Sequence, residues 1–232
     1  MLHIALALAL GCVHTSKGES RAGVGAATDP EPIGPDFFDT FYLNPDPERV
    51  DAALRWVAPA FASKPNIVPA VQAELSCIFA RFPDHGQRWR ATIDGLPEPA
   101  HELLAVALSS PPAVLFANSG PSPSRNDMHW GCYFATGDTA HIAAIVEELA
   151  HLAAPADLNL FLTAASAEWS LASNARQHPS VREFLERARG SAEPLREAQL
   201  DRILRVESGV LHADFVESLG AHRDAKTWGD LP

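Results

Sequence analysis

The stretch NDMHWGCYFATGDTAHIAAIVEELAHL, residues Asn126–Leu152, gives the clearest indication of the fold because it has the features of a complete helical hairpin. Gly137 ends the first helix, since glycine adopts the left-handed conformation of a helix C-terminus without a steric penalty. Asp138 follows directly and caps the second helix. We expect the first helix to begin at Asn126 or Asp127. The stretch therefore predicts two helices joined by a tight turn.

The second half of this stretch has a helical spacing of apolar residues. Between Thr139 and Ala153 these residues recur every three or four positions and define one buried face: Ile142, Ile145, Val146, Leu149 and Leu152. Gly131 lies in the middle of the first helix, where glycine costs about 1 kcal/mol relative to alanine. We attribute this glycine to the close approach of another helix.

Helical patterns continue on both sides of the hairpin. Asp46 and Pro47 suit the cap and first residue of an early helix, and later helices are expected at 156–177, 179–189 and 192–207. Short connections make neighbouring helices antiparallel. We therefore expect an all-α fold of antiparallel helical hairpins, stacked as a short α-solenoid or an irregular helical bundle with packing of the tetratricopeptide or HEAT type. The sequence shows no strict repeat period.

The helical domain is expected to span residues 36–207. Its clearest internal loop makes residues 119–125 a candidate boundary between two subdomains, because serine, proline and glycine are concentrated there. Residues 208–232 are polar with isolated apolar side chains. We expect this last segment to form a loosely packed tail.

Composition and charge describe a globular protein and limit its partners. The chain has 232 residues, of which 47% are hydrophobic and 20% charged. Its formal net charge of −11 argues against binding to nucleic acid, because nucleic-acid-binding proteins gather Lys and Arg to neutralise phosphates. The 18 Lys and Arg residues form no basic stripe. Anionic membrane surfaces are disfavoured for the same reason.

The first twelve residues, MLHIALALALGC, suit a signal peptide and are too few to span a bilayer as a helix. Their end, from Ala9 to Cys12, resembles a bacterial lipobox, which implies lipidation of Cys12. Val13 stands where an aspartate would retain a lipoprotein in the inner membrane of enteric bacteria, so the resemblance implies the outer membrane. The alternative is an ordinary signal peptide or an apolar helix.

Residues 13–35 have the composition of a flexible linker. We expect a location at the periplasmic face of the cell envelope, with membrane contact only through the lipid anchor.

The remaining cysteines, Cys77 and Cys132, allow one disulfide bond in an oxidising compartment. Each lies in an apolar helical stretch. We therefore favour the interpretation that both are small buried hydrophobic side chains and are not bonded to each other.

Four residues of the opening stretch form a candidate metal site: His141, Glu147, Glu148 and His151. Their positions on the helix put Glu147 and His151 opposite the apolar face, where such pairs usually form weak surface contacts. A metal-assisted hydrolase that uses these four residues is one alternative. The sequence contains no nucleophile elbow, P-loop or C-x-x-C motif, and we expect no cofactor.

Two further segments combine aromatic and polar residues. The segment FFDTFYLNPDPERV predicts an apolar plug that closes one end of the helical array, with a partner-binding surface as the alternative. The segment EWSLASNARQHPSV has polar groups at a helix junction, which cap the helix or recognise a carboxylate or a peptide. The candidate ligand- or partner-binding residues are His129, Trp130, Tyr133, Trp169, Asn174, Arg176 and His178.

Three segments, FFDTFYLNPDPERV, NDMHWGCYFATGD and WSLASNARQHPSVREFLE, resemble a family of exported, helical bacterial proteins of unknown function. The resemblance implies an exported helical domain and assigns no catalytic residue. Our leading hypothesis is a non-enzymatic envelope protein whose helical scaffold binds a protein or peptide partner. The alternatives are the metal-assisted hydrolase and a bundle that binds a small molecule in a pocket lined by Trp130, Tyr133, Trp169 and His178.

Overall fold

The computed structural model describes residues 32–153 and 157–224. This part of the chain contains twelve α-helices and no strand, so the all-α prediction is confirmed. The helices are α2 (Pro35–Thr40), α3 (Val50–Ser63), α4 (Val68–Arg81), α5 (Gly86–Ile93), α6 (Ala100–Ser109), α7 (Pro112–Ala117), α8 (Pro123–Thr136), α9 (Ala140–Glu148), α10 (Leu158–Gln177), α11 (Pro179–Gly190), α12 (Pro194–Arg205) and α13 (Ser208–Asp224). The signal peptide, Cys12 and all but the end of the expected linker lie outside the described residues.

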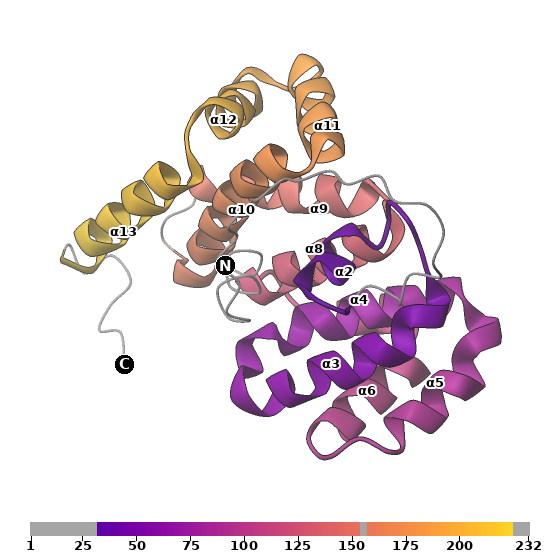
Figure 1. Ribbon diagram of the computed structural model, residues 1–232. Helices are drawn as coiled ribbons and strands as arrows, with labels where there is room; N and C mark the ends of the chain where they lie inside the picture. The colour runs from indigo at the N-terminus through magenta and orange to yellow at the C-terminus, as the bar shows by residue number, and fades with distance from the viewer. Residues whose placement is uncertain (1–31, 154–156, 225–232) are drawn as a thin grey trace, which may run out of the picture.

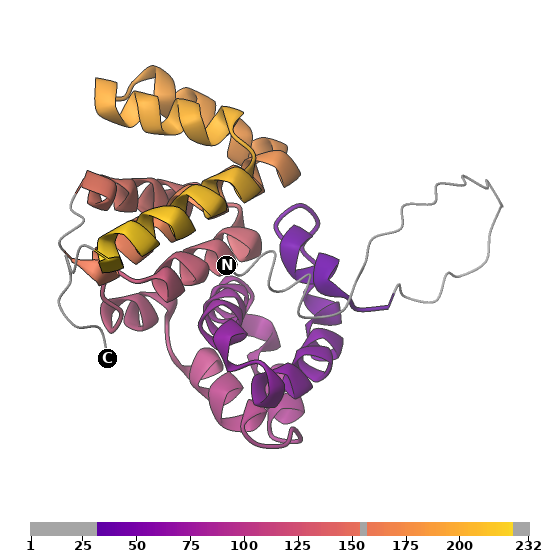
Figure 2. The same cartoon turned by 90° about the vertical axis from the view of Figure 1, so that its left-hand side faces the viewer.

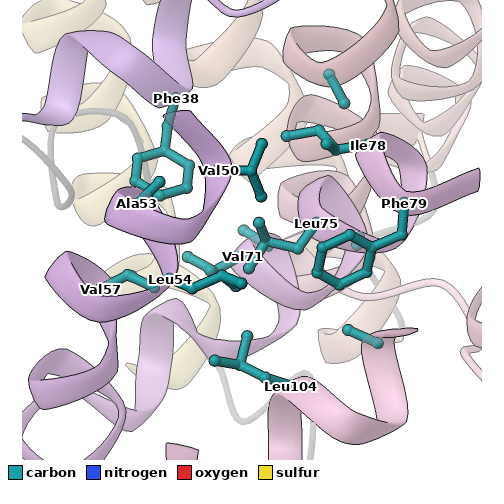
Figure 3. Close-up of a cluster of buried hydrophobic side chains, with 14 of the residues drawn as sticks. Phe38, Val50, Ala53, Leu54, Val57, Val71, Leu75, Ile78, Phe79 and Leu104 are labelled. Atoms are coloured by element: carbon teal, nitrogen blue, oxygen red, sulfur yellow. The ribbon is translucent and has the colours of Figure 1, made fainter. Parts of the chain in front are cut away.

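The helices form two groups on either side of α8 (Figures 1 and 2). Helices α3–α6 surround one hydrophobic cluster, and α9–α12 surround a second. Figure 3 shows the first cluster, in which side chains of α3, α4 and α6 meet, among them Leu54, Val57, Val71, Leu75 and Leu104. Burial of such side chains contributes roughly 1.5–3 kcal/mol each. The core is therefore divided between the two ends of the molecule.

Helix α8 takes part in both clusters. Met128, Cys132 and Ala135 on one face belong to the first cluster, and Trp130, Tyr133 and Phe134 on the other belong to the second. A helix with apolar residues on both faces needs neighbours on both sides. The connection near residues 119–125 therefore leads into a helix that is common to both clusters.

The helical hairpin predicted for the opening stretch is present. Gly137 adopts the left-handed conformation with φ 73° at the end of α8, and the Asp138 carboxylate accepts a hydrogen bond of 2.9 Å from the amide of Ala140. The predicted start of the first helix is wrong. Helix α8 begins three residues earlier at Pro123, because Ser122 caps it by accepting a hydrogen bond from the amide of Arg125 and proline suits the first turn.

Helix α4 packs along α8 more extensively than any other pair of the described helices. A Cβ atom added to Gly131 would lie 2.4 Å from the carbonyl oxygen of Ala70, so the predicted close approach is confirmed. In the same interface Cys77 and Cys132 form a disulfide bond, with Cα atoms 5.5 Å apart. Our expectation of two unpaired cysteines is wrong, although both are buried as expected. Sequence spacing did not reveal that α4 and α8 bring the two residues within bonding distance.

The aromatic residues of α2 and its following turn connect the two groups of helices; the phenylalanines are buried and Tyr42 is half-buried. Phe38 packs on Trp56 of α3, with ring centroids 5.8 Å apart. Tyr42 packs on Tyr133 at 5.1 Å, and its amide donates a hydrogen bond of 2.8 Å to the carbonyl of Phe134. The expected aromatic plug therefore links α3 to α8 rather than closing one end of the array.

The segment after residue 207 differs from the expected loose tail. Residues Ser208–Asp224 form α13, which packs against α10 and buries Leu211. Its apolar residues do not follow one helical face, and this explains why their spacing did not predict a helix. Among the described residues, no helix combines the length and the apolar composition that a membrane crossing needs.

Candidate functional site

A groove of about 620 Å³ lies between α9, α11 and α12. Its walls are mostly apolar and carry a few charged and polar side chains. The residues that line it are Ala143, Val146, Glu147, Ala150, Phe184, Ala188, Ser191, Ala192, Glu193, Leu195, Arg196, Gln199 and Leu200. A concave, largely apolar surface with a small number of polar groups is typical of a binding site.

The local sequence explains why this groove is open. Helix α11 ends at Gly190 and α12 begins at Pro194, so three residues separate the two helices. Val181 of α11 and Leu200 of α12 are fully buried, and they hold the inner faces of these helices against the second cluster. The side chains facing the groove are small at four alanines and one serine, so they do not fill the space between the helices.

The rim of the groove is negatively charged. Arg196 is already engaged, because its guanidinium donates to the carbonyl of Val146 and lies 3.9 Å from the carboxylate of Glu147. The side chain of Glu147 is 81% exposed. Glu193 is exposed where α11 joins α12. The groove therefore presents two carboxylates to solvent beside an apolar floor.

A smaller pocket of about 250 Å³ lies between α10 and α13. Trp169 and His212 contribute rings whose centroids are 4.9 Å apart, and Phe215 completes the aromatic wall. Leu162 and Pro123 line the remaining sides. The pocket is almost entirely apolar, so it suits a small apolar molecule better than a charged one.

Tyr42, Tyr133, His178 and Ser180 form a hydrogen-bonded cluster between α2, α8 and α11. The hydroxyl of Ser180 lies 2.7 Å from the hydroxyl of Tyr133 and 3.2 Å from that of Tyr42. Tyr42 also lies 3.4 Å from Nδ1 of His178. Burial raises the pKa of Tyr133 and lowers the pKa of His178, so both groups are neutral near pH 7. The cluster satisfies its own polar atoms and ties the three elements together.

A second histidine cluster lies where α7, α8 and α9 meet. The Nδ1 atoms of His129 and His141 are 3.1 Å apart, and Phe116 stacks on the ring of His129 with centroids 4.4 Å apart. Burial lowers the pKa of His129 to about 4, and the neighbouring His141 adds to this effect. Burial also lowers the pKa of His141. Both imidazoles are therefore neutral near pH 7 and able to bind a proton donor or a metal ion.

Three carboxyl groups are sheltered from solvent near α8. Burial raises the pKa of Glu74 well above its usual value, and the charge of Asp39 raises it further. Burial raises the pKa of Asp39 to about 7 and that of Asp127 to about 6. Oε1 of Glu74 has no hydrogen-bond partner within the described part of the structure. The raised pKa values mean that burial shifts each carboxyl toward its protonated form, and this effect is strongest at Glu74.

The structure does not bring all the predicted binding residues into one concave site. Trp130, Tyr133 and His178 come together around Phe134, with centroid distances of 5.9, 5.3 and 4.8 Å from its ring. These side chains are buried and belong to or border the second cluster. In the described part of the structure, these three residues therefore do not line a common pocket with Trp169, as we had expected.

The other predicted residues lie apart. Trp169 lines the small pocket, and His129 lies beside His141. Asn174 is fully buried and donates a hydrogen bond of 3.0 Å to the carbonyl of Ser170. Arg176 donates to the carbonyl of Val206 and forms an ion pair with Glu207 at 3.2 Å. Asn174 and Arg176 thus stabilise the end of α10.

The four candidate metal ligands of the opening stretch are also dispersed. A carboxylate oxygen of Glu148 lies 3.3 Å from Nε2 of His151. Glu147 faces Arg196 across the groove rim, and His141 faces His129. Within the described residues, the three-residue group close enough to share an ion is Cys77, Cys132 and His141. This group combines His141 with two residues that we did not include in the predicted site.

The groove residues of α11 and α12 were missed by the sequence analysis. These residues include Phe184, Leu195 and Arg196. The feature that marks the groove is the exposure of Leu195, a large apolar residue that is 66% exposed. Helical spacing alone does not reveal such an exposure, since it depends on how the neighbouring helices pack. Comparisons with protein-family models, curated proteins and solved structures find no match to this chain. The resemblance to a family of exported proteins stays a prediction.

Proposed function

We propose that this protein is a non-enzymatic binding protein of the bacterial cell envelope, built on stacked antiparallel helical hairpins. It holds a helical segment of a protein partner in the groove between α9, α11 and α12. The observation that carries this proposal is the combination of an apolar floor with exposed carboxylates at the rim. Grooves with this combination bind amphipathic helices in other proteins.

The chemistry of the groove defines its occupant. Leu195, which is 66% exposed, and the half-buried Phe184 offer apolar surface to the apolar face of a helix. The small side chains on the walls allow the backbone of that helix to approach. Glu147 and Glu193 suit lysine or arginine at the edges of the apolar face. The net charge of −11 also attracts a basic segment over longer distances.

Two features support the envelope as the location. The lipobox-like end of residues 1–12 fits a lipid anchor on Cys12, and the Cys77–Cys132 disulfide fits an oxidising compartment. The anchor is then the membrane contact, and nucleic acid is not a partner. Metabolic labelling with a fatty acid tests this location. Label should be incorporated by the wild-type chain and lost on Cys12→Ala, and equal labelling of both would refute the anchor.

The groove is tested with a fluorescein-labelled helical peptide of leucine and lysine, whose binding is followed by fluorescence anisotropy. A matched peptide of leucine and glutamate has the same apolar face and the opposite charge. We expect the lysine peptide to bind at least tenfold more tightly. Equal binding of the two peptides would contradict the proposed role of the rim carboxylates.

Charge reversal locates the binding on the protein. Glu147→Lys combined with Glu193→Lys should weaken binding of the lysine peptide about tenfold, because each exposed pair contributes up to about 1 kcal/mol. The control combines Glu102→Lys with Glu217→Lys, which change the net charge equally at exposed sites outside the groove. An equal loss in the control would show that binding depends on net charge rather than on the groove.

The pocket beside Trp169 favours a second candidate function, the binding of a small apolar molecule. Naphthalene is a suitable probe because the pocket is aromatic and measures about 250 Å³. It should raise the Tm of the wild-type protein, since a ligand that binds the folded state stabilises it. Leu162→Trp fills the pocket and should abolish this effect. Absence of any rise in the wild-type protein would remove this candidate.

A further inference from the structure

The disulfide bond and His141 form a group that three helices bring together. Cys77 comes from α4, Cys132 from α8 and His141 from the start of α9. The two sulfur atoms and one ring nitrogen of His141 all lie within 4.8 Å of one another. Both cysteines are buried and the histidine is half-buried, so the group lies just beneath the surface.

The surroundings hold the imidazole of His141 in place. His129 lies against it with the two Nδ1 atoms 3.1 Å apart, and Phe116 stacks on it with centroids 5.8 Å apart. Metal-binding histidines in proteins are usually restrained by such neighbours, which set the ring orientation and the tautomer. His141 is therefore presented beside the two cysteines as a neutral ligand.

We propose that the reduced chain binds one Zn²⁺ ion through Cys77, Cys132 and His141. Two thiolates and one imidazole are ligands that zinc prefers, and three protein ligands leave a fourth position for water or a small molecule. The cysteine Cα atoms are 5.5 Å apart, so side-chain rotation is enough to direct both sulfurs at one ion. This inference does not rest on the role proposed for the groove.

The disulfide and the metal ion exclude each other. A dithiol reductant transfers two electrons and two protons to the Cys77–Cys132 bond, which breaks to give two thiols while the reductant becomes a disulfide. In the thiol state Cys132 Sγ can donate to the carbonyl of Ala73, 3.2 Å away. Binding of Zn²⁺ then forms two Zn–S bonds and one Zn–N bond and releases the two thiol protons to solvent.

Co²⁺ is the spectroscopic probe for this site, because it takes the place of Zn²⁺ and reports thiolate ligation by a charge-transfer band. Full-length protein is reduced with a phosphine, freed of reductant without oxygen and titrated with Co²⁺. We expect one equivalent to bind, with a thiolate-to-cobalt band that Zn²⁺ removes. The disulfide form should give no such band. Absence of the band in the reduced protein would overturn the proposal.

Three variants assign the ligands. Cys132→Ser should abolish the band, and His141→Ala should weaken Co²⁺ binding at least tenfold while leaving the disulfide able to form. His101→Ala removes a surface histidine paired with Glu98 and should bind as the wild type does. Circular dichroism of each reduced variant verifies folding. Unchanged affinity in His141→Ala would overturn the proposal even if Cys132→Ser failed to fold.

Discussion

The interface between α4 and α8 is closely packed, whereas the groove between α9, α11 and α12 is open to solvent. In the interface, Gly131 lets two backbones come together and a disulfide locks them. In the groove, small side chains leave space between helices, and carboxylates stand in solvent. The difference suggests separate roles: we expect stability to be concentrated at the close interface, and we propose that recognition takes place at the open groove. Substitutions at the interface should therefore affect folding, and those at the groove should affect binding.

The largest effect is expected from Gly131→Leu. Even a Cβ atom at this position would lie 2.4 Å from the carbonyl oxygen of Ala70, so the side chain forces α4 and α8 apart. We expect a loss of more than about 4 kcal/mol in the free energy of unfolding, measured by urea denaturation. Gly220→Leu is the matched control, because no atom lies within 4 Å of a Cβ there. A similar loss at both glycines would mean that the α4–α8 interface is not unusually tight.

The next effect is expected from removal of the disulfide. Cys77 and Cys132 are 55 residues apart in sequence, and their bond restricts the unfolded chain. Cys77→Ser combined with Cys132→Ser should lower the free energy of unfolding by about 2–4 kcal/mol. Denaturation of the wild-type protein in the presence of a reductant should give a similar loss in metal-free buffer. An unchanged midpoint in both experiments would show that the bond contributes nothing to the stability of the interface.

A smaller, pH-dependent effect is expected at Glu74. Its pKa is raised above 4.5 in the folded state, so above this pH the folded chain holds a proton that the unfolded chain has lost. Stability should therefore fall as pH rises from 4.5 through the raised pKa, by up to about 1.4 kcal/mol per pH unit. Glu74→Gln should reduce this fall and be the more stable form at pH 8. Parallel stability curves for the variant and the wild type would contradict the raised pKa.

The smallest effect on stability is expected at the groove. Glu147→Lys combined with Glu193→Lys alters exposed side chains, and the ion pair of Glu147 with Arg196 is long at 3.9 Å. The free energy of unfolding should change by less than about 0.5 kcal/mol. Thermal unfolding at neutral pH measures this change. A loss comparable to that of the disulfide variants would show that the groove residues contribute to stability, which would contradict the expected difference between the interface and the groove.

Much of the fold was predictable because it depends on local signals. The left-handed Gly137, the cap at Asp138 and the tight contact at Gly131 each follow from the conformational properties of the residue itself. The start of α8 was misplaced because the serine and proline before it also fit a loop. Helix α13 was missed because its apolar residues do not share one face, so its burial depends on contacts with α10.

The candidate site was less predictable because it depends on distant contacts. The pairing of Cys77 with Cys132 requires α4 and α8 to lie side by side, and sequence spacing does not give this arrangement. The groove arises where α9, α11 and α12 meet, with small side chains on the walls and a short connection between α11 and α12. His129, Trp130 and Trp169 were singled out by residue type, but the fold places them in three different environments.

The proposed role of the groove in recognition is tested most directly by mapping the bound lysine peptide on the protein. The ¹⁵N-labelled protein is titrated with the leucine–lysine peptide, and amide chemical shifts are recorded by nuclear magnetic resonance. We predict that the shifts are concentrated in α9, α11 and α12, at and around Val146, Phe184 and Leu200. Shifts concentrated in α3–α6, or a uniform response over the whole surface, would contradict the claim that the groove is the recognition site.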